Sequence, residues 1–104
     1  MVQILSESDD FKQILADNKI VVVDCFAEWC GPCKRIAPDF AKMSDQDAGA
    51  KYIKVDVDDL EDFAAEYSIE AMPTFLVFKD GELFKRVVGA NIAGVQEAIN
   101  AAKA

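Results

Sequence analysis

The sequence predicts an α/β protein in which a central mixed sheet is flanked by helices, with the element order βαβαβαββα and one domain over residues 1–104. Three observations lead to this prediction. The chain has 104 residues, 52% of them hydrophobic, which is enough for one compact core. Short β-branched runs alternate with segments in which apolar residues recur at helical spacing. Near the end, an Asp-Gly pair separates two apolar runs, which is typical of an antiparallel hairpin.

The first strand and helix are predicted at the start of the chain. Val2–Leu5 has the composition of a short strand. Ser6 and Asp9 have the spacing of a capping box, in which two side chains bond the free N–H groups at a helix start. The helix that follows has an apolar face made of Phe11, Ile14 and Leu15.

The second strand and helix form the centre of the predicted fold. Residues 20–26 are almost continuously apolar, which is typical of a strand covered on both faces. A helix is predicted to begin at Gly31-Pro32, because proline is favoured in the first turn. Pro38 falls inside this helix and should kink it. Its apolar face comprises Ile36, Phe40 and Met43.

A third strand is predicted over Tyr52–Val57, followed by a short helix. Asp58 and Glu61 resemble a second capping box at the start of that helix. Its apolar face comprises Leu60, Phe63, Ala64 and Tyr67.

The last elements are a hairpin and a helix. Phe75–Phe78 and Leu83–Val88 read as strands joined at Asp80-Gly81. Asn91 is suited to cap the final helix, whose apolar residues are Ile92, Val95 and Ile99. The alternation of strands and helices predicts parallel strands joined by crossover helices, with the antiparallel hairpin at the end.

Charge and hydropathy exclude several kinds of partner. The net charge is −8, whereas nucleic acids and anionic membranes require a basic surface. No apolar run approaches the roughly 18–20 residues that span a bilayer, and the N-terminus lacks the pattern of a signal peptide. We therefore expect a cytoplasmic protein. The acidic stretch 56–62 fits a solvated helix start, since a calcium loop would need an oxygen ligand and a glycine where Leu60 and Glu61 stand.

The chain has three cysteines and no histidine. The odd count does not suggest a framework of structural disulfides. The lack of histidine excludes Cys–His proteases and Cys/His zinc sites. Any cysteine chemistry must therefore activate its thiol in another way.

Cys30 and Cys33 are the strongest candidates for chemistry. Two thiols separated by two residues can close a small disulfide ring, and the predicted helix start lies at the carboxyl end of the central strand, where α/β sheets place their sites. The free N–H groups and dipole of the helix favour a thiolate at Cys30. Cys33, further into the helix, should be more shielded and act as the resolving thiol. Two inert buried cysteines, or a zinc site shared by two chains, are the alternatives.

The chain resembles thioredoxins over essentially its whole length. The segments that carry the resemblance are Val23-Asp24, Ala27 to Lys34, Ala37-Pro38, Val55 to Asp58, Met72-Pro73-Thr74, Lys79-Asp80-Gly81 and Val88 to Asn91. The Trp-Cys-Gly-Pro-Cys core is highly specific, and the Met-Pro-Thr and Val-Gly-Ala-Asn segments look like the eukaryotic cytosolic type.

The resemblance implies the thioredoxin fold and the activity of a general protein-disulfide reductase. Cys30 would attack a substrate disulfide, and Cys33 would resolve the mixed disulfide. Reducing equivalents would come from NADPH through thioredoxin reductase, while the chain itself, expected to be a monomer, would bind neither cofactor nor metal.

The resemblance also implies roles for residues around the pair. Asp24 would be a buried proton acceptor for Cys33, and Lys54 would be its partner. A strand-end acid that reaches water and a surface lysine are the alternatives. Pro73 would be cis, although a trans proline is the commoner case. The substrate-binding surface would comprise Trp29, Gly31, Pro32, Met72, Pro73, Val88, Gly89 and Ala90. Partial core burial is the alternative for Trp29, and close backbone approach is the expected reason for Gly89.

Two residues depart from the family pattern: Cys25 stands where an aromatic is more common, and Phe26 where tryptophan or tyrosine is. Strand alternation puts Cys25 on the opposite face from Asp24, where it should be a small buried hydrophobe, a regulatory thiol being the alternative. Gly31-Pro32 favours a reductase over an oxidase, an isomerase or a glutaredoxin-like protein. A redox-dependent binding module that uses the same surface stays open.

Overall fold

The computed structural model describes residues 1–104 and contains the predicted βαβαβαββα order. The strands are β1 (Val2–Ile4), β2 (Ile20–Phe26), β3 (Lys51–Asp56), β4 (Thr74–Lys79) and β5 (Glu82–Val88). The helices are α1 (Phe11–Asp17), α2 (Gly31–Asp45), α3 (Glu61–Glu66) and α4 (Ile92–Lys103). Pro38 lies inside α2, which continues past it to Asp45. A kink at Pro38 stays a prediction.

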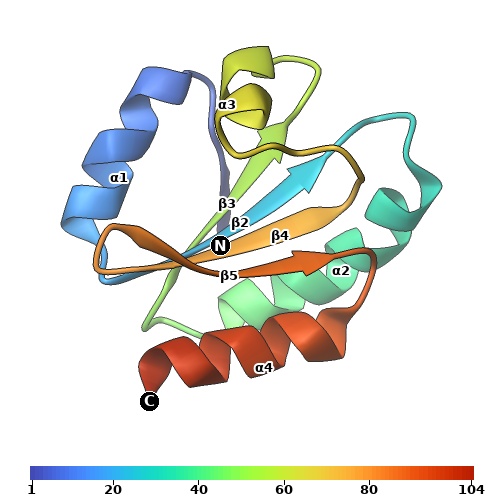
Figure 1. Ribbon diagram of the computed structural model, residues 1–104. Helices are drawn as coiled ribbons and strands as arrows, with labels where there is room; N and C mark the ends of the chain where they lie inside the picture. Colours follow the sequence, from blue (N-terminus) through green and yellow to red (C-terminus); the bar gives the residue numbers. More distant parts are fainter.

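The five strands form one mixed sheet in the order β1-β3-β2-β4-β5 (Figure 1). Strands β1, β3 and β2 are parallel, whereas β4 is antiparallel to both β2 and β5. The prediction of parallel crossovers throughout was therefore wrong for β4. Helix α3 has six residues and rises only about 9 Å, whereas a six-residue strand spans roughly 20 Å. The chain therefore stays at the carboxyl end of β3 and enters β4 from there.

Helices cover both faces of the sheet (Figure 1). On one face, Phe11 of α1 and Phe63 of α3 pack against Val21 and Val23 of β2. On the other face, α2 and α4 enclose a second core, whose members include Ile20, Val22, Phe40, Phe75, Val95 and Ile99. The burial of all residues from Ile20 to Cys25 confirms that β2 is a central strand.

Turn and cap residues explain several of the element ends. Asp80 and Gly81 have φ values of 53° and 85°, as the two central residues of a tight hairpin turn require. The Asn91 side chain accepts a hydrogen bond from the Gly94 N–H (3.0 Å), which confirms the predicted cap of α4. The hairpin and the final helix are thus specified by local sequence.

The two predicted capping boxes were wrong. A 3-10 turn over Ser8–Asp10 precedes α1. No side chain caps the start of this turn or the start of α1. Helix α3 begins after Leu60, and the Asp58 N–H instead donates to the carboxylate of Asp56 (2.9 Å). Short polar side chains also bond nearby backbone groups in turns, so the same spacing arises without a cap.

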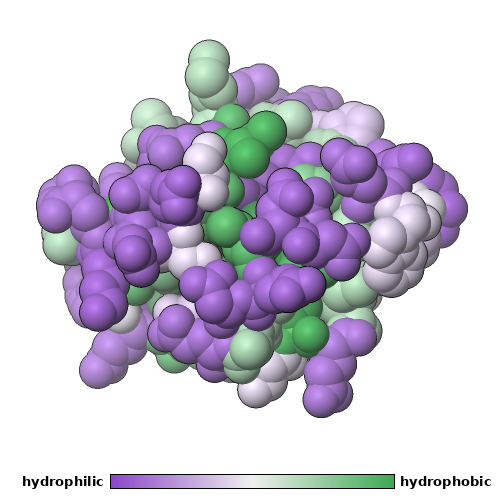
Figure 2. Space-filling model, turned by 90° about the horizontal axis from the view of Figure 1, so that it is seen from above, coloured by the Kyte–Doolittle hydropathy of each residue, from purple (hydrophilic) through white to green (hydrophobic).

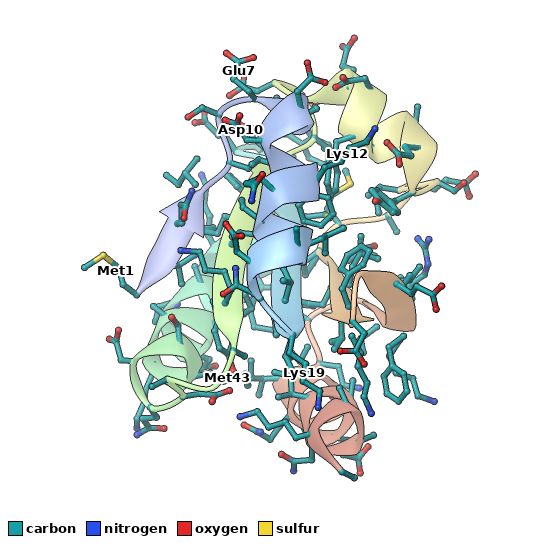
Figure 3. The ribbon with its side chains drawn as sticks, turned by 90° about the vertical axis from the view of Figure 1, so that its left-hand side faces the viewer. Met1, Glu7, Asp10, Lys12, Lys19 and Met43 are labelled. Carbon is teal, nitrogen blue, oxygen red and sulfur yellow. A yellow bond between two sulfur atoms is a disulfide. The ribbon has the colours of Figure 1, made fainter.

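The face shown in Figure 2 is mostly hydrophilic, in keeping with the strong negative charge, with hydrophobic residues exposed between the polar ones near its centre. Figure 3 shows α1 in front of the sheet, with Lys12 of α1 and Asp10 of the preceding turn at the surface, and Met1 at the start of β1. No helix is long and apolar enough to cross a bilayer.

Candidate active site

Cys30 and Cys33 lie at the start of α2 and form a disulfide, with their Cα atoms 5.3 Å apart. Cys30 is the N-cap residue, and the Cys33 N–H donates to its Sγ (3.2 Å). The turn before the helix is closed by the Cys30 N–H, which donates to the Ala27 carbonyl (3.1 Å). Pro32 stands in the first helical turn, where its missing N–H leaves no bond unmade. The predicted helix start is therefore confirmed.

We predicted that Cys33 is more shielded than Cys30, but the two cysteines are equally buried. Each is only 4% exposed in the disulfide form, and both belong to the core on the α1 and α3 face of the sheet. They differ instead in their neighbours. The Cys30 sulfur faces the helix N-terminus, which favours a negative charge there once the disulfide is reduced. The two thiols are therefore distinguished by the position of the Cys30 sulfur at the helix N-terminus, and not by their exposure.

Backbone groups of the loop before β4 lie directly beside the disulfide. The Met72–Pro73 peptide bond is cis, so the alternative of a trans proline is wrong. The Met72 carbonyl oxygen is 3.6 Å from the Cys30 Sγ. The Pro73 carbonyl accepts from the Gly89 N–H (2.8 Å), and the Thr74 hydroxyl donates to the Ala71 carbonyl (2.5 Å). These bonds hold the loop in place next to the sulfur.

Gly89 is needed for its backbone conformation. Its φ is +96°, a region that side-chain-bearing residues rarely adopt, and a Cβ built at this position would meet nothing within 4 Å. The expected reason, close approach of another backbone, was therefore wrong. The left-handed turn at Gly89 directs its N–H to Pro73 and so joins the end of β5 to the active-site loop.

Trp29 lies at the surface beside the disulfide and is 70% exposed, so core burial is excluded for it. Its indole N–H donates to the Asp58 carboxylate (3.0 Å). The sequence interpretation missed Asp58, which was assigned to a solvated acidic helix start. No local pattern could have found this contact, because the two residues are 29 positions apart and only the fold brings them together.

The predicted substrate surface surrounds the cysteine pair. Trp29 precedes the pair and Gly31 and Pro32 lie between its two cysteines, and all three are exposed. Val88, which pairs with Thr74 of β4, is exposed as well. The remaining predicted members are Met72, Pro73, Gly89 and Ala90, of which only Pro73 is buried. The pair is therefore ringed by small and apolar groups that open to solvent.

Asp24 lies in the centre of the sheet and is fully buried, which excludes an acid that reaches water. Neither carboxylate oxygen has a hydrogen-bond partner within the protein. Burial raises the pKa of Asp24 to about 6, and the positive charge of Lys54 opposes this rise. Lys54 is level with Asp24 on the parallel neighbour β3, so the two side chains share one face of the sheet.

A hollow of about 310 Å³ opens at the surface beside Cys33 and Lys54. It is lined by Phe26, Ala27, Glu28, Cys33, Lys34, Ala37 and Lys54. A hollow of this size has room for water molecules next to the Cys33 and Lys54 side chains. The fold therefore gathers Cys33, Lys54 and the buried Asp24 at the carboxyl end of β2 and β3.

Cys25 is free, fully buried and turned to the opposite face from Asp24, as predicted. Burial and the Asp24 charge raise the pKa of its thiol to about 12, against a smaller opposing effect of Arg86. We therefore predict that iodoacetamide labels no cysteine of the native oxidised protein and one cysteine per chain in denaturant, as counted by mass spectrometry. Rapid labelling of the native protein would contradict this and would support a regulatory thiol.

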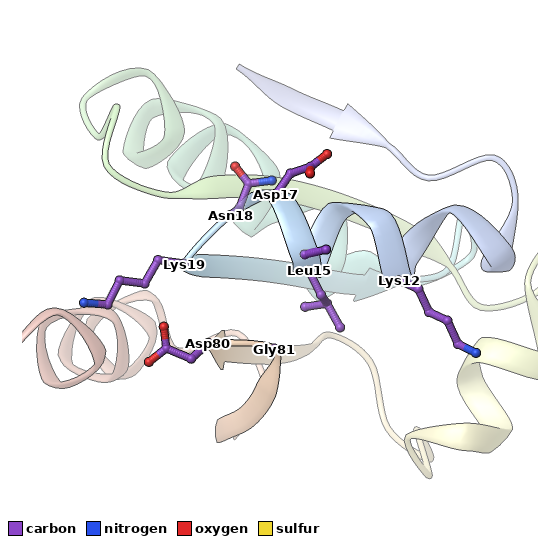
Figure 4. A pocket seen from close by; sticks show the side chains of 8 residues that line it. Lys12, Leu15, Asp17, Asn18, Lys19, Asp80 and Gly81 are labelled. Carbon is purple, nitrogen blue, oxygen red and sulfur yellow. The ribbon is translucent and has the colours of Figure 1, made fainter.

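A larger hollow, of about 700 Å³, lies at the other end of the sheet (Figure 4). It is formed by the end of α1 and the β4–β5 turn, with Lys12, Lys19 and Asp80 among its lining residues. Lys19 precedes β2, whereas the cysteines follow it, so the length of the strand, roughly 20 Å, separates the two places. No group of His, Cys, Asp and Glu side chains is arranged to hold a metal.

A disulfide-forming cysteine pair at a helix start, next to a cis-proline loop on a mixed sheet, defines a thiol–disulfide oxidoreductase. The family model "Thioredoxin" matches residues 2–101. The chain belongs to the thioredoxin family, and it contains the redox-active pair of that family.

Individual relatives agree with this assignment. Thioredoxin-1 of Schizosaccharomyces pombe is 50% identical over 101 residues, which cover 97% of this chain and 98% of that protein. The crystal structure of the Malassezia sympodialis thioredoxin superposes with a TM-score of 0.92 at 46% identity, covering 100% of this chain and 92% of that one. Mitochondrial thioredoxin 3 of Saccharomyces cerevisiae superposes with a TM-score of 0.91 at 34% identity, with coverages of 95% and 93%.

Proposed function

We propose that this chain is a general protein-disulfide reductase in which Cys30 is the attacking thiolate and Cys33 the resolving thiol. The observation that carries the proposal is the open apolar surface around the pair, with the Met72 carbonyl 3.6 Å from the Cys30 sulfur. An extended substrate segment can pair with backbone groups at such an edge, whatever its side chains are. Recognition of this kind suits a catalyst that serves many different proteins.

The reaction proceeds in two exchanges. The Cys30 thiolate attacks one sulfur of the substrate disulfide, which forms a mixed disulfide and releases the first substrate thiolate. Cys33 then loses its proton and attacks the Cys30 sulfur, which closes the Cys30–Cys33 disulfide and releases the second thiolate. Both leaving thiolates take up protons. Two electrons pass from the cysteine pair to the substrate, so the pair is oxidised and the substrate reduced.

Asp24 is proposed as the acceptor of the Cys33 proton, through water in the hollow. With a pKa of about 6, the carboxylate is mostly ionised at neutral pH and is still basic enough to hold a proton for a short time. Lys54 is proposed to keep it ionised, since a positive charge nearby offsets the effect of burial. These two residues would perform the work that a histidine performs in other cysteine enzymes.

We further propose that an NADPH-dependent thioredoxin reductase restores the dithiol, and that the protein acts as a monomer in the cytoplasm. The site is complete within one chain, which supports the monomer. The structure whose name marks it as mitochondrial is only 34% identical, against 50% for S. pombe thioredoxin-1, which supports a place outside the mitochondrion. Microscopy of the tagged chain tests the compartment, and a mitochondrial signal would contradict our proposal.

An insulin-reduction assay with a thioredoxin reductase and NADPH tests the proposed function. The wild type should oxidise NADPH continuously in the presence of insulin, and Cys30→Ser should reduce the rate to background. Cys25→Ala is the matched control, because it removes the one cysteine outside the site and should retain the wild-type rate. If the reduced wild type binds insulin without turnover, the protein is a redox-dependent binding module instead.

The hydrogen bond between Trp29 and Asp58 gives a prediction for substrate binding. Asp58→Ala should raise the KM for insulin about two- to fivefold with little change in kcat, because a single exposed hydrogen bond contributes about 0.5–1 kcal/mol. Trp29 is the only tryptophan, so the anisotropy of its fluorescence should fall in the variant. Asp59→Ala is the control at the next position, and an equal effect there would contradict the role of this bond.

A further inference from the structure

Phe26, the last residue of β2, contacts the lysine that faces the buried acid. The Lys54 ammonium lies 4.5 Å from the centroid of the Phe26 ring, over its face. The backbone of Lys54 is level with Asp24, whereas Phe26 is level with Asp56. The lysine side chain therefore leans along the sheet toward its carboxyl end, where Cys33 lies.

The same two residues form one wall of the hollow beside the cysteine pair. Phe26 and Lys54 line it together with Cys33 and Ala37 of α2. Two more charged residues stand around it, Glu28 on the β2–α2 loop and Lys34 on α2. Of all these charges, Lys54 is the one whose field acts on the Asp24 carboxyl. The position of the Lys54 ammonium group within the hollow therefore affects the pKa of Asp24.

A lysine has a flexible four-carbon stem and a strongly hydrated charge, so a half-buried lysine readily turns its ammonium toward water. The face of an aromatic ring attracts a cation, and this attraction grows where water is partly excluded. An aromatic ring at position 26 can thus hold the charge inside the hollow. An aliphatic side chain of similar size would fill the same space without this attraction.

We propose that Phe26 is a positioning residue for the resolving step, which holds the Lys54 ammonium against its ring so that the charge faces Asp24 and Cys33. The inference rests on the proposed roles of Asp24 and Lys54. The covalent step itself is unchanged: Cys33 gives its proton to Asp24 and attacks the Cys30 sulfur.

The direction of the effect follows from the charges. Burial raises the pKa of Asp24 and the Lys54 charge lowers it, so an ammonium that spends more time in solvent lets the pKa rise. If the pKa rises from about 6 to about 7, the ionised fraction at pH 6 falls from about one half to about one tenth. The resolving step at pH 6 should then slow about fivefold, with a smaller effect at pH 8.

The test is a titration of the Asp24 carboxyl carbon by NMR in the wild type and five variants. Phe26→Leu should move the midpoint upward toward that of Lys54→Met, whereas Phe26→Trp, which keeps a ring, should leave it near the wild type. The double variant Phe26→Leu/Lys54→Met should titrate like Lys54→Met alone. Lys51→Met is the matched control, since it removes a charge from the other end of β3 and should leave the midpoint unchanged.

The outcomes separate this inference from the proposed function. An unchanged midpoint in Phe26→Leu, or a further rise in the double variant, would overturn the positioning role while insulin reduction and its loss in Cys30→Ser stand. An unchanged midpoint in Lys54→Met would overturn the role of Lys54 as well. If Phe26→Leu does not fold, the wild type still decides: the ε-methylene protons of Lys54 should show an upfield ring-current shift, and its absence would refute the contact.

Discussion

The Cys33→Ser variant should attack a substrate disulfide once and then stop, with the substrate still attached to Cys30. Serine leaves no thiol at position 33 to attack the Cys30 sulfur, so the mixed disulfide persists. Turnover of insulin should fall at least about a thousandfold, because loss of a residue that makes or breaks the covalent intermediate removes nearly all of the catalysis. The helix start should remain intact, since the hydrogen bond that caps it comes from the backbone N–H of residue 33, which serine retains.

Mass spectrometry without reductant measures this outcome directly. Reduced Cys33→Ser mixed with a disulfide-linked peptide dimer should gain the mass of one of the two peptides and release the other as a thiol, and dithiothreitol should remove the attached peptide. Cys30→Ser treated in the same way should gain none, although it retains Cys33. Trapping by Cys30→Ser and none by Cys33→Ser would reverse the roles that we assign to the two thiols.

Asp24→Asn should make the protein more stable at neutral pH by an amount that disappears in acid. Asp24 is buried without a hydrogen-bond partner, and its pKa is about 6 in the folded protein against 3.8 for the free side chain. Between these values the folded state binds a proton that the unfolded state releases, so the free energy of unfolding of the wild type falls as the pH rises from about 4 to about 6. By linkage, the ionised carboxylate costs about 3 kcal/mol above pH 6.

Guanidinium unfolding of both proteins at pH 4 and pH 8 tests this expectation. The difference in unfolding free energy between variant and wild type should be about 3 kcal/mol larger at pH 8 than at pH 4, in favour of Asp24→Asn. Asp59→Asn, which removes an exposed carboxylate, should show no such pH dependence. The variant should also resolve mixed disulfides more slowly, since the proposed proton acceptor is gone. A difference that does not change with pH would mean that the pKa of Asp24 is the same in the folded and unfolded states.

The parts of the fold that the sequence predicted correctly are those that local chemistry specifies. The β-branched run from Ile20, the Asp80-Gly81 turn and the Asn91 cap each depend on residues that are close together in the chain. The start of α2 at Gly31-Pro32 belongs to the same group, and with it the main feature of the site. For this reason the cysteine pair could be placed at the end of the central strand from the sequence alone.

The parts that could not be predicted depend on contacts between distant residues. The direction of β4 follows from the small length of α3, whose ends no capping residue marks. The bond from Trp29 to Asp58 exists only after the fold brings two loops together. The equal burial of the two cysteines depends on the side chains packed around the disulfide, which the helical position of each residue does not reveal.

The central claim is that electrons flow from this cysteine pair to substrates, and the equilibrium reduction potential of the pair tests it most directly. A titration in glutathione or dithiothreitol buffers, followed by the fluorescence of Trp29, gives this potential. We predict a value near about −270 mV, as is typical of thioredoxins, which drives reduction of most substrate disulfides. A value near about −120 mV, as in strongly oxidising relatives, would contradict the account and would make this protein a donor of disulfides.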